Sequence, residues 1–177
     1  MPDVPTQLRP ALFLDRDGVL NEDRGYVSRW EDFHWIAGAK ETVAAFNRAG
    51  WLVIVVTNQS GVGRGYYTED DMHGLHARMG EDLAAGGAHI DAFYYAPQHP
   101  ESRLAAYRHP DPPLRKPNPG MILRALQEWP IDVERSLLIG DKPSDLEAAL
   151  RAGIKGVLFE GGDLAAFLKA QALWPER

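Results

Sequence analysis

The sequence contains no cysteine. Disulfide bonds, thiol nucleophiles and cysteine-ligated zinc sites are therefore excluded, and this composition is typical of a reducing compartment such as the cytoplasm. Long hydrophobic runs are also missing. The strongest apolar run, residues 51–56, is far shorter than the roughly 20 residues of a membrane-spanning helix, and residues 1–10 carry no apolar signal-peptide core. We therefore expect a cytoplasmic protein without a membrane partner.

Basic residues are in the minority. Lys and Arg number 19 against 25 Asp and Glu, which gives a formal net charge of −6 at pH 7. This charge repels the phosphate backbone of nucleic acids, so we expect a small-molecule ligand and no nucleic-acid partner. Hydrophobic residues make up 45% of the chain and charged residues 25%, which are ordinary values for a globular protein. Residues 1–177 are predicted to form a single domain, and a monomer is expected because no exposed apolar helix stands out.

Short runs of branched and aromatic residues recur along the chain. They lie at residues 11–14, 52–56, 92–95, 137–139 and 156–159. Their apolar residues are continuous rather than alternating, which is typical of strands buried on both faces of a parallel sheet. Helical patterns separate most of these runs, so the sequence predicts an open, parallel, Rossmann-like α/β sheet flanked by helices.

The helices are predicted from their periodicity and their capping residues. The expected helices are residues 38–48, which stop at Gly50, and three more that start at Thr68 with Asp71, at Asn118 with Pro119, and at Ser144 with Glu147. The residues named with the last three supply capping side chains, capping boxes or a first-turn proline.

Other segments fit neither a helical nor a strand period. Residues 22–35 and 97–119 are long enough to be lids or binding loops. The glycine-rich residues 61–65 lack the spacing of a dinucleotide-binding loop, so we interpret them as a flexible turn. His73 and His76 lie one helical turn apart and are interpreted as part of a solvated helix face.

Polar side chains follow three predicted strands where each strand ends. Asp15 and Asp17 follow the first, residues 57–60 follow the second, and Asp141 follows the fourth. Ligands of open α/β sheets bind beyond the carboxyl ends of the strands, so these groups are expected to meet. Carboxylates without thiols or a histidine pair suit Mg²⁺, which keeps substrate phosphate among its ligands. The basic residues 115–116 lie just before a helix start, where an anion would be held.

The same residue types suit phosphoryl transfer. One carboxylate can attack phosphorus and form an aspartyl phosphate, while a second carboxyl group acts first as an acid and then as a base. Asp15 and Asp17 have this geometry available, because both follow a strand that leads into a turn.

These segments resemble the motifs of the haloacid dehalogenase-like (HAD) phosphatases. The resemblance covers about residues 11–160 and rests on four motifs in the right order: Asp15-Arg16-Asp17-Gly18-Val19, Thr57-Asn58-Gln59-Ser60-Gly61, Arg115-Lys116-Pro117 with Gly120-Met121, and Gly140-Asp141-Lys142 with Asp145. Within the superfamily the chain is most similar to the group of D-glycero-D-manno-heptose 1,7-bisphosphate 7-phosphatases and histidinol-phosphatases, which have a minimal cap. The resemblance implies a Mg²⁺-dependent phosphomonoesterase of carbohydrate metabolism, in the synthesis of heptose for lipopolysaccharide.

The resemblance also implies roles for individual residues. Asp15 would be the nucleophile and Asp17 the general acid and base, and Asp15, Asp141 and the backbone carbonyl of Asp17 would ligate Mg²⁺. Thr57 and Lys116 would hold the transferring phosphoryl group together with Asn58. The residues expected to contact the rest of the substrate are Asp23, Arg24, Gly25, Tyr26, Gln59, Ser60, Arg115 and Lys142.

The sequence departs from this group in one loop. Members commonly carry a zinc-stapled loop, whose four ligand positions read Ala96, Gln98, Pro112 and Leu114 in this chain. No structural zinc is therefore expected. His99 and His109 remain in the loop and are interpreted as solvated, because two histidines without further ligands rarely hold zinc.

Several alternatives stay open at this level. Histidinol phosphate is a second candidate substrate, and a nucleic-acid 3′-phosphatase has a similar Thr-Asn-Gln-x-Gly stretch, although the net charge disfavours it. A binding protein that keeps only the fold is a third possibility. Asp145 either supports a metal ligand or belongs to a helical first turn, and Trp30, Phe33 and Trp35 either rim the site or close the sheet edge.

Overall fold

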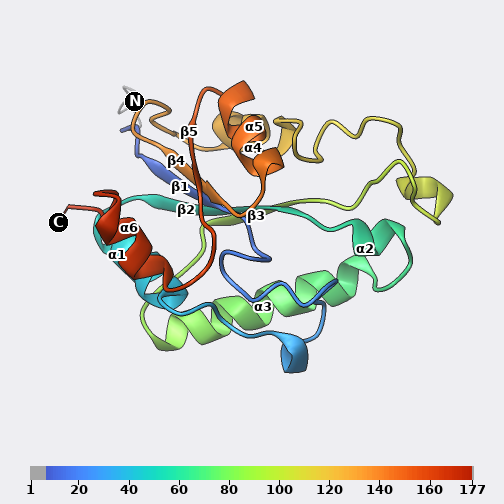
Figure 1. Cartoon of the computed structure of the whole chain (residues 1–177), viewed down its shortest axis with the longest axis horizontal. Helices are drawn as coiled ribbons and strands as arrows, with labels where there is room; N and C mark the ends of the chain where they lie inside the picture. Colours follow the sequence, from blue (N-terminus) through green and yellow to red (C-terminus); the bar gives the residue numbers. More distant parts are fainter. Residues whose placement is uncertain (1–6, 177) are drawn as a thin grey trace, which may run out of the picture.

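The computed structural model describes residues 7–176 of the chain. Residues 1–6, which belong to the segment without a signal-peptide core, lie outside the described residues. Parallel strands form one sheet in the order β3-β2-β1-β4-β5 (Figure 1). The strands are β1 (Ala11–Leu14), β2 (Leu52–Asn58), β3 (Ala92–Ala96), β4 (Leu137–Gly140) and β5 (Lys155–Leu158). The predicted parallel α/β sheet is thus confirmed.

The central strand is buried on both faces. Leu12 and Leu14 of β1 pack into one hydrophobic cluster, whereas Phe13 packs into the cluster on the opposite face. β1 lies between β2 and β4, where Leu12 pairs with Val53 on one side and Leu137 on the other. Because both faces of these strands are covered, their sequences are continuously apolar.

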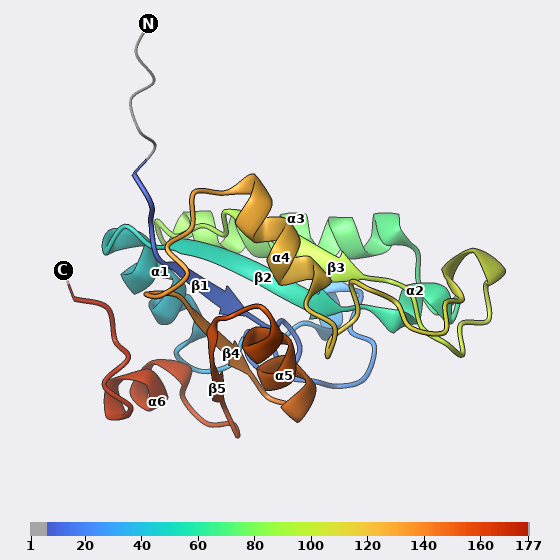
Figure 2. The same ribbon diagram turned by 90° about the horizontal axis from the view of Figure 1, so that it is seen from above.

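Helices cover the two faces of the sheet (Figures 1 and 2). Residues of α1 (Ala39–Arg48), α3 (Glu69–Ala85) and α6 (Leu164–Ala170) fill one cluster, and residues of α4 (Gly120–Glu128) and α5 (Pro143–Arg151) fill the other. Within residues 7–176, no helix combines the length and the apolar composition that crossing a membrane requires.

The start of α3 agrees with the prediction, and the start of α4 does not. Thr68 accepts a hydrogen bond from the backbone N–H of Asp71 at 3.1 Å, and its own N–H donates to the Asp71 carboxylate at 2.8 Å. Asn118 does not cap α4, because its side-chain oxygen accepts a hydrogen bond from Arg151 of α5 at 3.1 Å instead of one from a helix N–H. A tertiary contact with α5 thus replaces the predicted cap.

The start of α5 also differs from the prediction. The helix begins at Pro143, which places Ser144 inside its first turn. The carboxylate of Asp145 accepts the two backbone N–H groups that precede the helix, each at 3.1 Å. Glu147 pairs with Arg151 and takes no part in a capping box. The prediction was therefore wrong by two residues in register, with Lys142 rather than Ser144 before the first turn, because the proline starts the helix earlier.

The two long loops contain short helical turns. Residues 22–35 include η1 (Trp30–Asp32), and residues 97–119 include η2 (Ala105–Tyr107). The prediction of a turn for the glycine-rich residues 61–65 was wrong for residues 61–63, because Ser60–Gly63 form the short helix α2, whereas residues 64–65 are a turn. The loop of η2 packs on α2, where the Leu104 N–H donates to the Gly63 carbonyl at 3.0 Å.

The aromatic residues after β1 close the fold rather than rim the cavity described below. Phe33 is buried in the hydrophobic cluster that contains residues of α1 and α3, and the Trp30 ring stacks on the Phe33 ring with 5.2 Å between their centroids. The indole N–H of Trp35 donates to Asp82 of α3 at 2.8 Å. These contacts decide between the two readings that the sequence left open.

Candidate active site

The carboxyl ends of β1, β2 and β4 meet at one edge of the sheet, as the motif positions predict. A cavity of about 630 Å³ opens there. Its lining residues are Asp15, Asp17, Asp23, Gly25, Tyr26, Asn58, Gln59, Ser60, Arg64, Tyr67, Arg115, Lys116, Pro117, Lys142, Ser144 and Asp145. Most of the residues singled out in the sequence are thus brought together, and Thr57 is buried beside them.

A buried lysine connects two carboxylates beneath this cavity. The Lys116 Nζ lies 3.0 Å from Asp15 Oδ1 and 2.6 Å from Asp145 Oδ1, and it donates to the Val56 carbonyl at 2.8 Å. Burial acts to lower the pKa of Lys116, but the two carboxylates outweigh it and raise the pKa above its usual value. Lys116 therefore stays protonated at neutral pH.

Asp15 is the most perturbed carboxyl group of the cavity. Burial raises its pKa to about 7, against the opposing charge of Lys116. Its full ionisation at neutral pH therefore needs more positive charge than Lys116 supplies. A strongly perturbed carboxyl group in a cavity is a typical feature of a catalytic site.

The positive charge that Asp15 needs could be supplied by a cation bound at Asp141. The Oδ1 atom of Asp141 is buried and has no hydrogen-bond partner among residues 7–176, and burial raises the pKa of this carboxyl group. Oxygens of Asp15, Asp141 and Asp145 lie within 4.8 Å of one another. Asp145 is already engaged by Lys116 and two backbone N–H groups. At Asp15, Lys116 and the Arg16 N–H contact Oδ1, so the other carboxylate oxygen and Asp141 remain for a cation. These oxygens suit a hard divalent ion such as Mg²⁺.

Glycine is required where the loop after β1 passes Asp141. A Cβ atom at Gly18 would lie 2.1 Å from Asp141 Oδ2, and the backbone there has a φ of +88°. This close approach brings the backbone of the 15–18 loop next to the carboxylate that could hold the cation.

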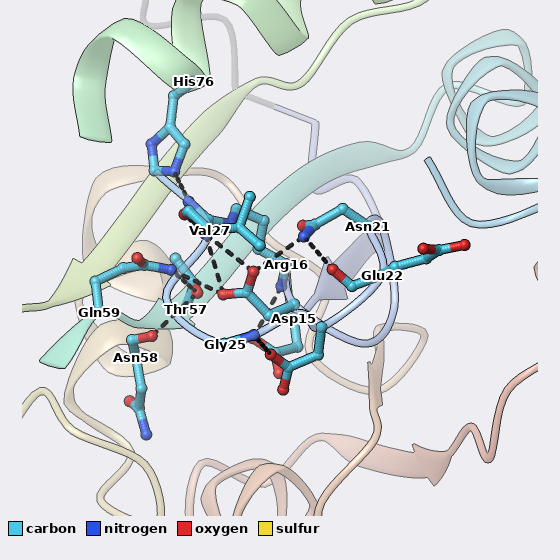
Figure 3. Close-up of polar contacts among 12 residues, drawn as sticks. Asp15, Arg16, Asn21, Glu22, Gly25, Val27, Thr57, Asn58, Gln59 and His76 are labelled. Carbon is cyan, nitrogen blue, oxygen red and sulfur yellow. Dashed lines mark hydrogen bonds and ion pairs between the residues drawn. The ribbon is translucent and has the colours of Figure 1, made fainter. Parts of the chain in front are cut away.

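The Asp17 carboxylate is held by several donors, and the side chains that supply them, Arg16, Asn21 and Gln59, are labelled in Figure 3. The Arg16 Nη2 contacts its two oxygens at 2.9 and 3.1 Å, Asn21 donates at 3.0 Å, and Gln59 donates at 3.1 Å. Gln59 also donates to Thr57 and accepts a hydrogen bond from the Tyr67 hydroxyl. The carboxylate is thus oriented at the edge of the cavity next to Asp15.

Behind Asp17 lies a residue whose role the sequence did not reveal. His76 is buried, and its Nε2 lies 3.2 Å from Arg16 Nη1, whereas His73 is exposed. The prediction of a solvated face was therefore wrong for His76. Its position on the helix could have indicated this, because it shares one face with Met72 and Met79.

Basic side chains line the other side of the cavity. Arg64 and Arg115 each have a buried nitrogen without a hydrogen-bond partner in the described part of the chain. Burial and the neighbouring charge of Arg64 lower the pKa of Arg115. Two guanidinium groups with free donors form a site that favours an anion. Arg64 was not among the residues predicted from the sequence.

The remaining predicted contacts lie at the mouth of the cavity. Lys142 lies 3.8 Å from Asp23, and Tyr26, with a φ of +53°, meets the exposed Tyr66 edge to face at 4.7 Å. Arg24 does not line the cavity and pairs with Glu22 instead.

Comparisons with known proteins identify the family. A family model described as HAD-hydrolase-like matches residues 113–173. A D-glycero-beta-D-manno-heptose-1,7-bisphosphate 7-phosphatase of Rhodopseudomonas palustris is 48% identical over 165 residues, which cover 91% of this chain and 89% of that protein. The chain belongs to this family of HAD-like phosphatases.

Two further relatives support the family assignment. A D-glycero-alpha-D-manno-heptose-1,7-bisphosphate 7-phosphatase of Burkholderia mallei is 49% identical over 144 residues, 81% of this chain and 76% of that protein. A crystal structure of the D,D-heptose 1.7-bisphosphate phosphatase from B. bronchiseptica, complexed with magnesium and phosphate, matches with a TM-score of 0.76 and 30% identity, and covers 94% of this chain and 89% of that one.

In this HAD-like phosphatase, hydrogen bonds hold the loop of residues 97–119, in which the four zinc-ligand positions carry residues that do not bind zinc. The Tyr107 hydroxyl donates to Glu69 of α3 at 2.8 Å, and the His99 N–H donates to the Tyr107 carbonyl at 3.1 Å. The Nδ1 atoms of His99 and His109 accept backbone N–H groups two residues further on. Hydrogen bonds thus connect the loop to itself and to α3.

Proposed function

We propose that this chain removes the 7-phosphate of D-glycero-D-manno-heptose 1,7-bisphosphate through an aspartyl-phosphate intermediate. The observation that carries the proposal is the buried Lys116 between Asp15 and Asp145, beside the unpartnered oxygen of Asp141. This arrangement supplies a carboxylate nucleophile, a cation for the phosphoryl oxygens and a place for a divalent metal in one cavity. The similarity to two heptose-1,7-bisphosphate 7-phosphatases supports the choice of substrate.

The proposed reaction has two steps. A carboxylate oxygen of Asp15 attacks phosphorus and the bond to the sugar oxygen breaks, while Asp17 donates a proton to that oxygen. Asp17, now a carboxylate, then takes a proton from the water that attacks the aspartyl phosphate. This releases inorganic phosphate and restores both carboxyl groups. Thr57, Asn58 and Lys116 would hold the phosphoryl oxygens during both steps. Lys116 would act through its positive charge, since its N–H groups already contact Asp15, Asp145 and the Val56 carbonyl.

Asp15, Asp141 and the Asp17 carbonyl would hold Mg²⁺. The ion would neutralise charge on the nucleophile and on the transferring phosphoryl group. The raised pKa of Asp15 and the unpartnered oxygen of Asp141 support this assignment.

Replacing Asp141 with Asn is expected to raise the Mg²⁺ concentration for half-maximal activity by about 10–100-fold or more, because a charged ligand is lost. The measurement is phosphate release against Mg²⁺ concentration at saturating substrate. Asp23→Asn is the control, since this carboxylate lines the same cavity on the sugar side and its loss should leave the Mg²⁺ requirement unchanged. An unaltered requirement in Asp141→Asn would contradict the assignment.

A second phosphate on the substrate would meet Arg64 and Arg115. Both line the same cavity as Asp15, and both carry a buried nitrogen free for an anion. The second phosphate of a bisphosphate would therefore pair with these two guanidinium groups, whereas histidinol phosphate would leave them without an anionic partner. The net charge of −6 also disfavours a nucleic-acid 3′-phosphatase. The residues at the mouth, Tyr26 and Lys142 among them, would contact the sugar.

The test is Mg²⁺-dependent phosphate release from the two anomers of D-glycero-D-manno-heptose 1,7-bisphosphate. We expect rapid release from one anomer, and none from the Asp15→Asn variant. Histidinol phosphate and a 3′-phosphorylated oligonucleotide are the comparison substrates. Faster turnover of either one would overturn the proposed substrate, and release that survives in Asp15→Asn would overturn the mechanism.

The proposal extends to the setting of the enzyme. We infer that residues 1–177 act as a single domain and as a monomer in the cytoplasm, without structural zinc and without a nucleic-acid or membrane partner. The absence of cysteine and the formal charge of −6 support this inference. The enzyme would act in the synthesis of heptose for lipopolysaccharide.

A further inference from the structure

Arg16 is a fully buried cation between the two proposed catalytic aspartates. Its Nη2 contacts both oxygens of Asp17 and donates to the Val27 carbonyl at 2.6 Å, while its Nη1 lies 3.2 Å from His76. The guanidinium group is planar and rigid, so a hydrogen bond at Nη1 helps to fix where Nη2 points, together with the bond from Nη2 to the Val27 carbonyl. The partner of Nη1 therefore contributes to the direction of the Asp17 carboxylate, beside Asn21 and Gln59.

That partner can only be an acceptor. Arginine has donors and no acceptor, so the contact is a hydrogen bond only if the His76 Nε2 has a free lone pair and the proton is on Nδ1. Burial lowers the pKa of His76 to about 3, and the charge of Arg16 lowers it as well, so the ring is neutral. The ring stacks on Phe93 of β3 at 4.3 Å with an interplanar angle of 12°. His76 is thus a neutral acceptor with a defined orientation (Figure 3).

We propose that His76 is a positioning residue for the acid–base step. By accepting from Arg16 Nη1 it orients the guanidinium group, and the guanidinium group holds Asp17 in line with the leaving oxygen. His76 does not touch the substrate, because it lies behind Arg16 on α3. This inference rests on the proposed function, in which Asp17 protonates the sugar oxygen.

The test compares two leaving groups. The sugar alkoxide needs a proton from Asp17, whereas p-nitrophenolate is stable enough to leave without one. A loss of acid positioning therefore lowers kcat/KM for the heptose bisphosphate more than for p-nitrophenyl phosphate. A general loss of folded enzyme lowers both equally. The ratio of the two kcat/KM values is thus independent of how much of a preparation is folded.

His76→Leu removes the acceptor and keeps an apolar group against Phe93. We expect kcat/KM for the heptose bisphosphate to fall about tenfold or more, mainly through kcat, and that for p-nitrophenyl phosphate to fall less than about threefold. His76→Gln places an amide oxygen near the position of Nε2 and is expected to restore the ratio. Asp17→Asn gives the ratio for an enzyme that lacks the acid altogether.

His73→Leu is the matched control on the exposed face of the same helix, and its ratio of the two kcat/KM values should equal that of the wild-type enzyme. His76→Met is a second variant without a strong acceptor, in case the leucine is poorly tolerated. An unchanged ratio in both acceptor-free variants would overturn the inference, as would a glutamine variant that behaves like leucine. If the wild-type enzyme hydrolyses neither substrate, both the proposed function and the role of His76 are overturned. If the wild-type enzyme is active but the ratio of the two kcat/KM values is the same in the His76 variants, only the role of His76 is overturned.

Discussion

Asp15→Asn is expected to reduce kcat for phosphate release by at least about 10⁴-fold, to the background of the assay. The amide has nearly the shape of the carboxyl group, but its nitrogen and oxygen do not form an acyl phosphate. The loss should appear in kcat for every substrate, because the same group attacks phosphorus whatever the leaving group is. The raised pKa of Asp15 and its place at the end of β1 single out this carboxyl group.

A second measurement separates a lost nucleophile from a damaged fold. Mass spectrometry of the unchanged enzyme, quenched in acid during turnover, should find the phosphoryl group on the peptide that contains Asp15. Thermal unfolding of Asp15→Asn in the presence of Mg²⁺ shows whether the variant is folded. Substantial turnover by a folded Asp15→Asn variant, or a phosphoryl group on another residue, would contradict the assignment.

Lys116→Met is expected to lower the free energy of unfolding by about 3–5 kcal/mol, because it leaves buried carboxylates without their partner. The Lys116 Nζ lies 3.0 Å from Asp15 and 2.6 Å from Asp145, and all three side chains are buried. Methionine fills a similar volume, so the effect comes from charge rather than from a cavity. The same variant should lose most of its activity, since Lys116 also holds the phosphoryl oxygens in the proposed mechanism.

The pH dependence of this destabilisation follows from Asp15. Burial already raises its pKa to about 7, above the value of 3.8 for the unperturbed group, and Lys116 opposes that shift. Without Lys116 the pKa in the folded state rises further, so the folded protein binds more protons than the unfolded chain. The stability of the variant therefore falls as the pH rises, and the penalty should be larger at pH 8 than at pH 5.

Urea denaturation without Mg²⁺ measures both effects. Lys142→Met is the matched control, because this lysine is exposed and lies 3.8 Å from Asp23, so its loss should cost less than about 0.5 kcal/mol. A Lys116→Met variant as stable as the control at pH 8 would show that the carboxylates do not need the buried lysine.

Much of the fold could be predicted from local patterns. Strands such as β2 are marked by continuous apolar residues, because both of their faces are covered. The capping box of Thr68 and Asp71 was predicted correctly, since a capping box involves only residues three apart. The meeting of Asp15 with Asp141 also follows from sequence order, because parallel strands deliver their carboxyl ends to one edge.

Other features needed the packed structure. Asn118 has the right type and position for a cap, but its side-chain oxygen accepts from Arg151 of α5 instead. The interpretation of His76 as solvated failed because its surroundings come from Arg16 and Phe93, which lie on other segments. These contacts join residues far apart in the chain, and no local spacing encodes them.

By itself, the sequence determined the order of strands and helices, the helix cap at Thr68 and the edge of the sheet at which Asp15, Lys116 and Asp141 gather. Hydrophobic periodicity and backbone capping are local properties, so they can be read along the chain. Only the tertiary structure decided that Asp145 binds Lys116 and that His76 supports Arg16. The state of a buried polar group depends on which distant partners surround it, because burial without a partner is costly.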